Sequence, residues 1–234
     1  MRLGAFQFTA ASLLLVGLAG CGGGGSSTPP GPVVSTLSFP LQSAFKSFVA
    51  NGATKTFTVS SGCSGSGNRA SAPANTAATF EGVAGFSAVQ SLTMSLTNCT
   101  PASTAVTYTS YYDANYIPLG FNSVGVNYGV YLTAPVIAAS VTVGNTGTIG
   151  TTTLYTDSTK AVGNGRQDLS YIVEADTAST AIVNLIAKVY NSGSVLTSTE
   201  QVRYRIASTG ALVPISDDIQ YANTSTLHLI ITYN

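Results

Sequence analysis

The sequence predicts an all-β domain: an antiparallel meander forming a curved sheet, a sandwich or a partly open barrel, with one short N-terminal helix. Its C-terminal half contains runs of about 8 to 13 residues rich in β-branched and aromatic side chains, separated by turn-forming clusters. Apolar and polar residues alternate in two of these runs, as in the segment 202–206. Such alternation is typical of a strand with one face inward and one face toward water. Long hairpins fit all three arrangements, and the sequence does not separate them.

The remaining elements are predicted from spacing and composition. A helix is predicted over 41–49, where apolar residues recur at i, i+4, i+7 and i+8, with Pro40 in its first turn and Gly52 at its end. Strands are predicted at 54–60, 79–84, 89–96, 105–112 and 128–132, with a loop over 61–78. Turns are predicted at 144–147, 163–165, 176–179, 191–193, 208–210 and 222–225.

The N-terminal segment predicts export. Arg2 precedes an uncharged, largely apolar stretch, Leu3–Val16, that is shorter than the ~20 residues a membrane-spanning helix needs. We therefore expect residues 1–20 to be a signal peptide. The following Leu18-Ala19-Gly20-Cys21 resembles the lipobox of bacterial lipoproteins. This resemblance implies cleavage before Cys21 and attachment of acyl chains, such as palmitate, to that cysteine.

The resemblance also implies a location and a partner. Gly22 follows the cysteine, where an Asp would be the usual inner-membrane retention signal, so the chain is expected in the cell envelope, at the outer membrane. Two or more acyl chains hold a protein at a membrane almost permanently. Beyond the lipobox, the chain is similar to β-rich envelope lipoproteins of Gram-negative bacteria that have no assigned activity. The membrane, reached through Cys21, is thus the one partner predicted.

A tether and one domain follow the lipobox. The segment 21–35 is rich in Gly, Ser and Pro and lacks the apolar side chains needed to join a core. We therefore predict a single β-rich domain over 36–234. Cys63 and Cys99 remain as a pair in an exported protein, which predicts a disulfide. A metal or redox site is disfavoured, because the pair is not CxxC and no histidine lies nearby in sequence.

Composition narrows the function further. Charged residues make up 8% of the chain, and the nine basic and nine acidic residues balance to zero net charge. Nucleic-acid binding needs clustered Lys and Arg, so it is excluded as a function class. Few groups remain from which an active site could be built, and no cofactor or metal site is predicted.

The candidate catalytic motifs are weak. His228 is the one histidine and is expected on the outer face of the last strand. Ser43 and Lys46 match SxxK, but the other motifs of penicillin-recognising enzymes are missing. Segment 157–168 has acidic residues but not the spacing of a calcium loop, and is predicted to be a hairpin turn around Asn164-Gly165. We expect no enzymatic activity.

Other polar and aromatic residues leave alternatives open. Glu174 and Asp176 form a carboxylate pair at i, i+2 that suits a glycosidase, or else they pair with basic residues on neighbouring strands, namely Lys188, Arg203 and Arg205. Asp217 is in phase with apolar residues and is expected to be partly buried, unless Pro214 produces a bulge that turns it outward. A concentration of tyrosines suits either a core or a binding pocket: Tyr108, Tyr111, Tyr112, Tyr116, Tyr128 and Tyr131.

Two functions remain open at this stage. The first is a membrane-anchored, non-catalytic structural or interaction module. The second is a carrier of a hydrophobic ligand in a barrel-like cavity, with the predicted helix covering the mouth. No ligand-binding residue is assigned by the sequence.

Overall fold

The computed structural model describes residues 31–222 and 228–234, in which one helix and thirteen strands occur. The first half contains α1 (Leu41–Asn51), β1 (Ala53–Ser60), β2 (Ser64–Ser71), β3 (Thr76–Phe80), β4 (Val83–Thr97), β5 (Ser103–Asp113), β6 (Pro118–Ser123) and β7 (Asn127–Tyr131). The second half contains β8 (Thr146–Tyr155), β9 (Gly163–Ala175), β10 (Thr180–Tyr190), β11 (Leu196–Ala207), β12 (Leu212–Tyr221) and β13 (His228–Tyr233). The predicted all-β class with one helix is confirmed.

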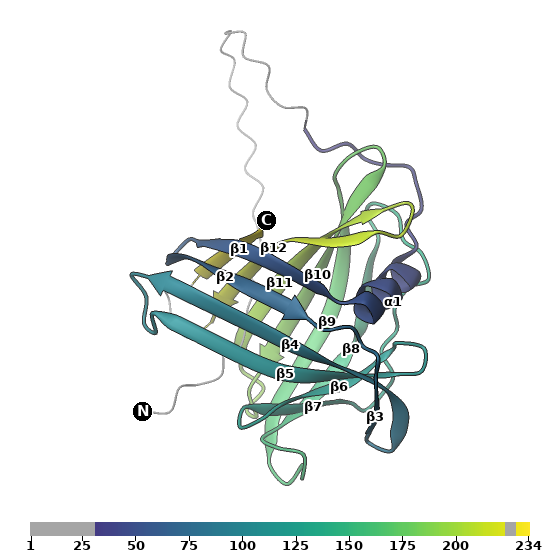
Figure 1. Ribbon diagram of the computed structural model, residues 1–234. Coiled ribbons are helices and arrows are strands. Elements are labelled where there is room, and N and C mark those ends of the chain that lie inside the picture. Colours follow the sequence, from purple (N-terminus) through teal and green to yellow (C-terminus); the bar gives the residue numbers. More distant parts are fainter. Residues whose placement is uncertain (1–30, 223–227) are drawn as a thin grey trace.

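The strands form a closed antiparallel barrel (Figure 1). The strands from β4 to β13 follow chain order around the barrel, β13 pairs with β1, and β1 pairs with β2. The barrel closes because β2 also pairs with β4, from Ser64 opposite Thr97 to Ser71 opposite Gln90. Strand β3 pairs only with β4 and lies outside the ring, which therefore has twelve strands. Of the arrangements left open by the sequence, the barrel is the one found, and it is fully closed.

Apolar side chains pack the two ends of the barrel interior. At the end that contains the Cys63 and Cys99 loops, an apolar cluster includes Phe57, Leu229 and Ile231. At the opposite end α1 lies across the barrel (Figure 1), and its Leu41 and Ala44 join a second cluster with Val183 and others. The polar centre of the barrel lies between these two apolar layers.

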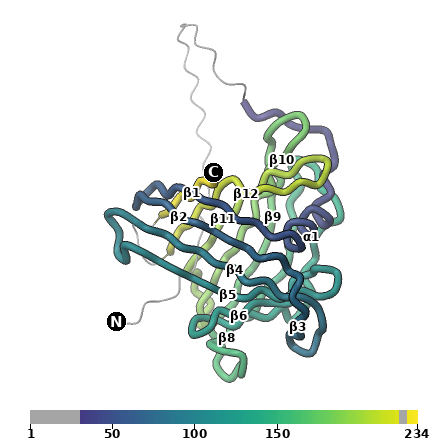
Figure 2. The backbone as a smooth tube through the Cα atoms, viewed as in Figure 1, coloured from purple at the N-terminus to yellow at the C-terminus, as the bar shows by residue number. Residues whose placement is uncertain are grey.

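The segment before α1 crosses the same end of the barrel (Figure 2). Val33 N–H donates to the carbonyl of Asp176 at 3.0 Å, and Phe39 exchanges backbone hydrogen bonds with Val141. Phe39 is fully buried in the cluster beneath α1. The helix is thereby fixed from its N-terminal side. The leader 1–20, Cys21 and most of the predicted tether lie outside the described residues.

The predicted loop over 61–78 is wrong, because residues 64–71 form β2. Its sequence, SGSGNRAS, has few β-branched residues, and no apolar side chain marks an inward face. The structure explains this composition. A Cβ atom at Gly67 would overlap the Phe57 ring and the carbonyl oxygen of Thr93, so only glycine fits between β1 and β4. The strand was missed because its residues suit close approach rather than β propensity.

Two other boundaries differ from the prediction. The strand predicted at 79–84 spans a hairpin turn instead, since Glu81 and Gly82 both have positive φ and separate β3 from β4. The turn predicted at 163–165 is part of β9, and the chain reverses earlier, where Asp157 accepts hydrogen bonds from the backbone N–H and hydroxyl of Thr159. Gly82 thus marks the β3–β4 turn, which the strand prediction overlooked, whereas Gly165 has a positive φ within β9 and does not mark a turn.

We expect Gly67→Ala to destabilise the protein by about 1–3 kcal/mol, because the new methyl group must displace the Phe57 ring or separate β2 from β4. Thermal unfolding measures this loss as a lower Tm. Ser66→Ala, on the exposed face of the same strand, is the control and should leave Tm nearly unchanged. Equal Tm values for the two variants would show that the contact at Gly67 is not tight.

No described helix is long and apolar enough to cross a membrane.

Candidate functional site

A cavity of about 160 Å³ lies inside the barrel next to α1. One part of its wall is apolar and comes from the helix and from strands on the far side, through Phe45, Phe48, Val49, Leu185, Leu212 and Pro214. The helix predicted to cover the mouth of a barrel therefore lines this cavity. Apolar clusters pack the two ends of the interior, so the space available corresponds to a small molecule rather than a long lipid chain.

The other part of the wall is polar. It consists of Lys55, Arg69, Ser71, Gln90, Tyr108, Ser110, Tyr204 and Tyr233. Lys55 and Arg69 are direct partners across β1 and β2, and Gln90 and Tyr108 are direct partners across β4 and β5. The polar side chains on the inward faces of β1, β2, β4 and β5 therefore line one shared cavity.

Arg69 is the centre of a hydrogen-bonded network. Its Nη1 donates to the hydroxyl of Tyr233 at 3.0 Å and to Oδ2 of Asp217 at 3.4 Å, and Glu200 Oε1 lies 3.9 Å from the same nitrogen. Asp217 and Glu200 belong to β12 and β11, whereas Arg69 belongs to β2, so these contacts cross the barrel interior. The guanidinium group is 30% exposed even though it lies inside the ring, because it lines the cavity.

Burial dominates the electrostatics of this network. It raises the pKa of Asp217 well above its usual range, and the adjacent Glu200 carboxylate adds to the rise while Arg69 opposes it. Burial likewise raises the pKa of Tyr204 to about 12, so its hydroxyl stays protonated as a hydrogen-bond donor. Arg69 keeps its positive charge: burial alone lowers its pKa, but electrostatic interactions with Tyr233, Glu200 and other neighbours together outweigh burial and raise the pKa above its usual value. At neutral pH, the cavity therefore presents fixed cationic and hydroxyl groups.

The predicted burial of Asp217 is confirmed, since the residue is 2% exposed. A bulge does occur beside Pro214, where Arg203 pairs with Ser216 and Tyr204 with Pro214. It changes the faces of the residues before Asp217 rather than that of Asp217 itself. As a result Val213 faces outward and Pro214 lines the cavity.

The carboxylate pair Glu174 and Asp176 makes the outer ion pairs expected of it. Arg203 Nε lies 3.4 Å from Glu174, and Arg205 makes two hydrogen bonds to Asp176, at 2.7 and 3.0 Å. Lys188 is instead the direct cross-strand partner of Asp168. The glycosidase interpretation is left without support, because each carboxylate is bound to an arginine on the outer face.

His228 links two hairpins on the outer surface. Its Nε2 lies 2.9 Å from Oδ1 of Asp218, and its Nδ1 lies 3.3 Å from the hydroxyl of Ser61. The same three residue types make up hydrolytic triads, but none of these side chains lines the cavity beside α1 or the shallow hollow near Gly52. The contacts connect the β1–β2 turn to β12 and β13, which is a structural role.

The SxxK residues do not act on each other. The Ser43 hydroxyl donates to the carbonyl of Pro40 at 3.3 Å, and the Lys46 ammonium lies 5.4 Å from the centre of the Tyr116 ring. In SxxK enzymes the amine must reach the hydroxyl to activate it. Ser43 and Lys46 therefore lack the hydroxyl–amine contact that an SxxK enzyme requires.

The tyrosine concentration divides between the two faces of the barrel. Tyr108 and Tyr112 line the cavity, whereas Tyr111 and Tyr128 pack against Phe80 of β3 on the outside, with ring centres 4.4 and 5.2 Å apart from it. Tyr128 also donates a 2.7 Å hydrogen bond to Glu81, which Lys160 contacts from the other side. Tyr108 and Tyr112 therefore fit the pocket interpretation, and Tyr111 and Tyr128 fit the packing interpretation.

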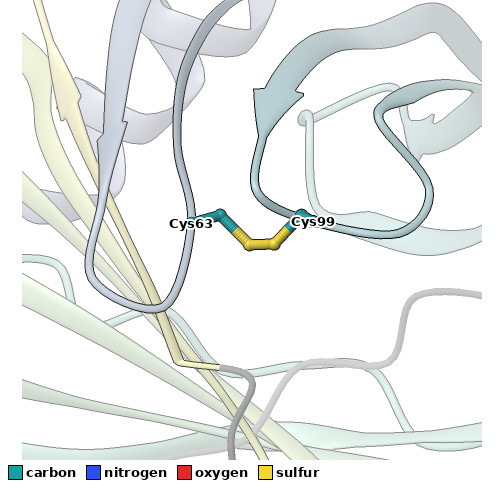
Figure 3. Close-up of a disulfide and its surroundings, with 2 residues drawn as sticks. All are labelled: Cys63 and Cys99. Atoms are coloured by element: carbon teal, nitrogen blue, oxygen red, sulfur yellow. A yellow bond between two sulfur atoms is a disulfide. The ribbon is translucent and has the colours of Figure 1, made fainter.

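Cys63 and Cys99 lie at disulfide distance, as predicted, with Cα atoms 5.7 Å apart (Figure 3). Cys63 follows the β1–β2 turn and Cys99 lies in the β4–β5 loop. Cys63 directly precedes Ser64 and Cys99 is two residues after Thr97, and Ser64 and Thr97 form the first pair of the β2–β4 seam. The bond therefore fastens one end of the pairing that closes the barrel.

Among the described residues, no group of three or more His, Cys, Asp or Glu side chains is placed to hold a metal. None of the known family models, curated proteins or solved structures is significantly similar to this chain. The site must therefore be interpreted from its own chemistry. Arg69 and Glu200 were not singled out from the sequence, whereas Tyr108 and Tyr112 were among the tyrosines for which a pocket was one of the two interpretations.

Proposed function

We propose that this protein is a membrane-anchored carrier that binds a small amphipathic ligand inside its barrel. The observation that supports this proposal is the cavity beside α1, with an apolar wall and an opposing wall of cationic and hydroxyl groups. Binding sites are commonly concave, mostly apolar and furnished with a few placed polar groups. This favours the carrier over a purely structural module, and no described cluster supports catalysis.

The size of the cavity limits the ligand. About 160 Å³ is close to the roughly 150 Å³ of a cavity that accepts benzene. A ligand of about ten non-hydrogen atoms fits this space, whereas the chain of a long fatty acid does not. Water alone is the competing occupant, because polar walls hydrate readily.

The test compares the ligand content of matched variants. Ala53 lines the cavity, and its neighbour Thr54 faces outward, so Ala53→Phe fills the space while Thr54→Phe adds the same ring outside. We expect native mass spectrometry of the purified full-length chain to find a bound small molecule in the wild type and in Thr54→Phe. Ala53→Phe should lack it. A protein that carries only water in all three forms, and that binds no small organic probe, would overturn the carrier.

We also propose that Cys21 is lipidated and holds the barrel at the outer membrane. The lipobox sequence supports this, and the chain up to about residue 35 supplies the tether. Cys21→Ala should abolish incorporation of labelled palmitate and release the protein from the membrane fraction. Ser26→Ala, five residues along the same tether, is the control and should be labelled like the wild type. Labelling that persists in Cys21→Ala would contradict the anchor.

A further inference from the structure

We propose that the ligand is a small carboxylic acid, with its carboxylate bound between Arg69 and Lys55 and its apolar part against α1. This inference rests on the proposed carrier function and adds the chemical class of the ligand. Three features of the cavity support it: the placement of its charges, the remaining donors of Arg69 and the position of the apolar wall.

The charges around the cavity are distributed unevenly. The cations Lys55 and Arg69 line the space, whereas neither Glu200 nor Asp217 does. The two carboxylates lie behind Arg69, toward the opposite strands. A ligand in the cavity therefore meets positive groups and hydroxyls first. This arrangement attracts an anion and gives no counter-charge to a cation.

Lys55 and Arg69 are directly opposite each other on neighbouring antiparallel strands. Like charges in this position repel and destabilise a sheet. Lys55 donates to the backbone oxygen of Asn234 at 3.4 Å, which is a long contact, and no acidic side chain is described beside it. An anion bound between the two cations would reduce this repulsion, because it interacts favourably with both.

Arg69 retains donors for such an anion. Its hydrogen bonds to Tyr233 and Asp217 both start from Nη1, and Tyr108 is a further hydrogen-bond partner, so a ligand carboxylate would share the remaining N–H groups of Nε and Nη2 with Tyr108. A guanidinium group binds a carboxylate best through two parallel N–H groups. Tyr108 and Tyr204 place hydroxyls on the same wall. The site thus has the donors for both carboxylate oxygens.

The apolar wall determines what kind of group the ligand carries next to its carboxylate. Phe45 and Phe48 of α1 line the cavity together with Leu185 and Leu212. The Phe48 ring also makes an edge-on contact with Tyr204, with ring centres 5.6 Å apart, so the apolar and polar walls meet there. An aromatic ring or a short branched chain next to the carboxylate meets these side chains. Benzoate has the required size and polarity, and benzyl alcohol is its neutral counterpart of nearly equal shape.

The experiment measures binding of benzoate and benzyl alcohol to the purified full-length chain by calorimetry. We expect benzoate to bind with a dissociation constant of about 10 μM to 1 mM, the range for so few atoms. Benzyl alcohol should bind about 10- to 100-fold more weakly, because it lacks the charge-assisted hydrogen bonds. Lys55→Met should reduce the affinity for benzoate by a similar factor. Lys188→Met, the same change on the exposed outer face, should not alter it.

The outcomes separate the two proposals. If benzyl alcohol binds as well as benzoate, and Ala53→Phe abolishes both, the carboxylate inference fails and the carrier stands. If Lys55→Met leaves benzoate affinity unchanged in a protein with wild-type Tm, the inference also fails. If neither probe binds and no native ligand is found, both proposals fail. Arg69 is left intact in these variants because its removal is expected to destabilise the barrel, so that a loss of binding could not be separated from a loss of stability.

Discussion

Replacing Arg69 with methionine should reduce the free energy of unfolding by about 3–5 kcal/mol at pH 8, the loss expected when one partner is removed from a buried ionic network. Asp217 and Glu200 would be left in the barrel interior without their cation. Typical proteins have only about 5–15 kcal/mol of stability, so this loss removes a large part of it and should lower the Tm clearly. Denaturant unfolding followed by circular dichroism measures the loss.

The control is Arg203→Met. Arg203 has the same exposed fraction as Arg69, 30%, and is paired with Glu174 at 3.4 Å. Its exposure is to bulk water on the outer face, however, where an ion pair contributes about 0–1 kcal/mol. Arg69, by contrast, lines the cavity inside the barrel. Equal losses in the two variants would contradict the interior network, because accessible area alone would then explain the stability.

Acid should partly rescue Arg69→Met. Burial raises the pKa of Asp217 in the folded state above its unfolded value, and removal of Arg69 raises it further. Between those two pKa values the folded protein holds a proton that the unfolded chain has released, so stability falls as the pH rises. The variant should therefore be closer to wild type at pH 5 than at pH 8. Asp217→Asn in the same chain should recover part of the loss at pH 8.

The sequence predicted the fold class because its information lies in local patterns. The helix was found from the spacing of its apolar face, and the C-terminal hairpins were found from alternation between turn signals. Strand order alone predicted ion pairs of Glu174 and Asp176 with basic residues of the following strands. The structure forms them with the two arginines of β11, two strands away, whereas Lys188 on the intervening β10 is opposite Asp168. Burial of Asp217 followed from its phase in β12.

Closure of the barrel was not predictable in the same way. It depends on β2, whose Gly, Ser and Asn residues are typical of a loop. They are required there because Phe57 fills the space that a side chain at Gly67 would occupy, and because Arg69 must face a cavity. A signal was available: with Cys63 bonded to Cys99, antiparallel pairing of the following eight residues with those preceding Cys99 is the natural continuation. The site was missed with the strand that carries it.

Because the chain has so few charged residues, the presence of several of them inside the barrel is informative about function. Only nine basic and nine acidic residues occur in 234, yet Arg69, Glu200 and Asp217 lie inside the barrel and Lys55 lines its cavity. Burying charges costs more free energy than burying apolar groups of similar size, so stability alone does not explain them. The proposed binding role would account for them, since a guanidinium group contacted by carboxylates on one side is held in place beside the cavity.

The disulfide should contribute about 4 kcal/mol, the chain-entropy value for two cysteines separated by 36 residues. We therefore expect the double variant Cys63→Ala and Cys99→Ala to lose about 2–4 kcal/mol in denaturant unfolding. The destabilisation should begin at one site in the structure. The bond lies beside Ser64 and Thr97, so its removal frees the end of the β2–β4 seam rather than a peripheral loop.

Hydrogen exchange distinguishes this local effect from a general one. In the double variant, amides of β2 and the paired half of β4 should exchange faster, while those of β9, β10 and β11 should change only with the global stability. Wild type under reducing conditions should reproduce the pattern, and it serves as the control for the lost side-chain packing of Cys63. If protection falls equally in all strands, the disulfide stabilises the chain without fastening the seam. Because β2 also carries Arg69, opening of the seam should weaken benzoate binding in the same samples, which links closure of the barrel to the cavity.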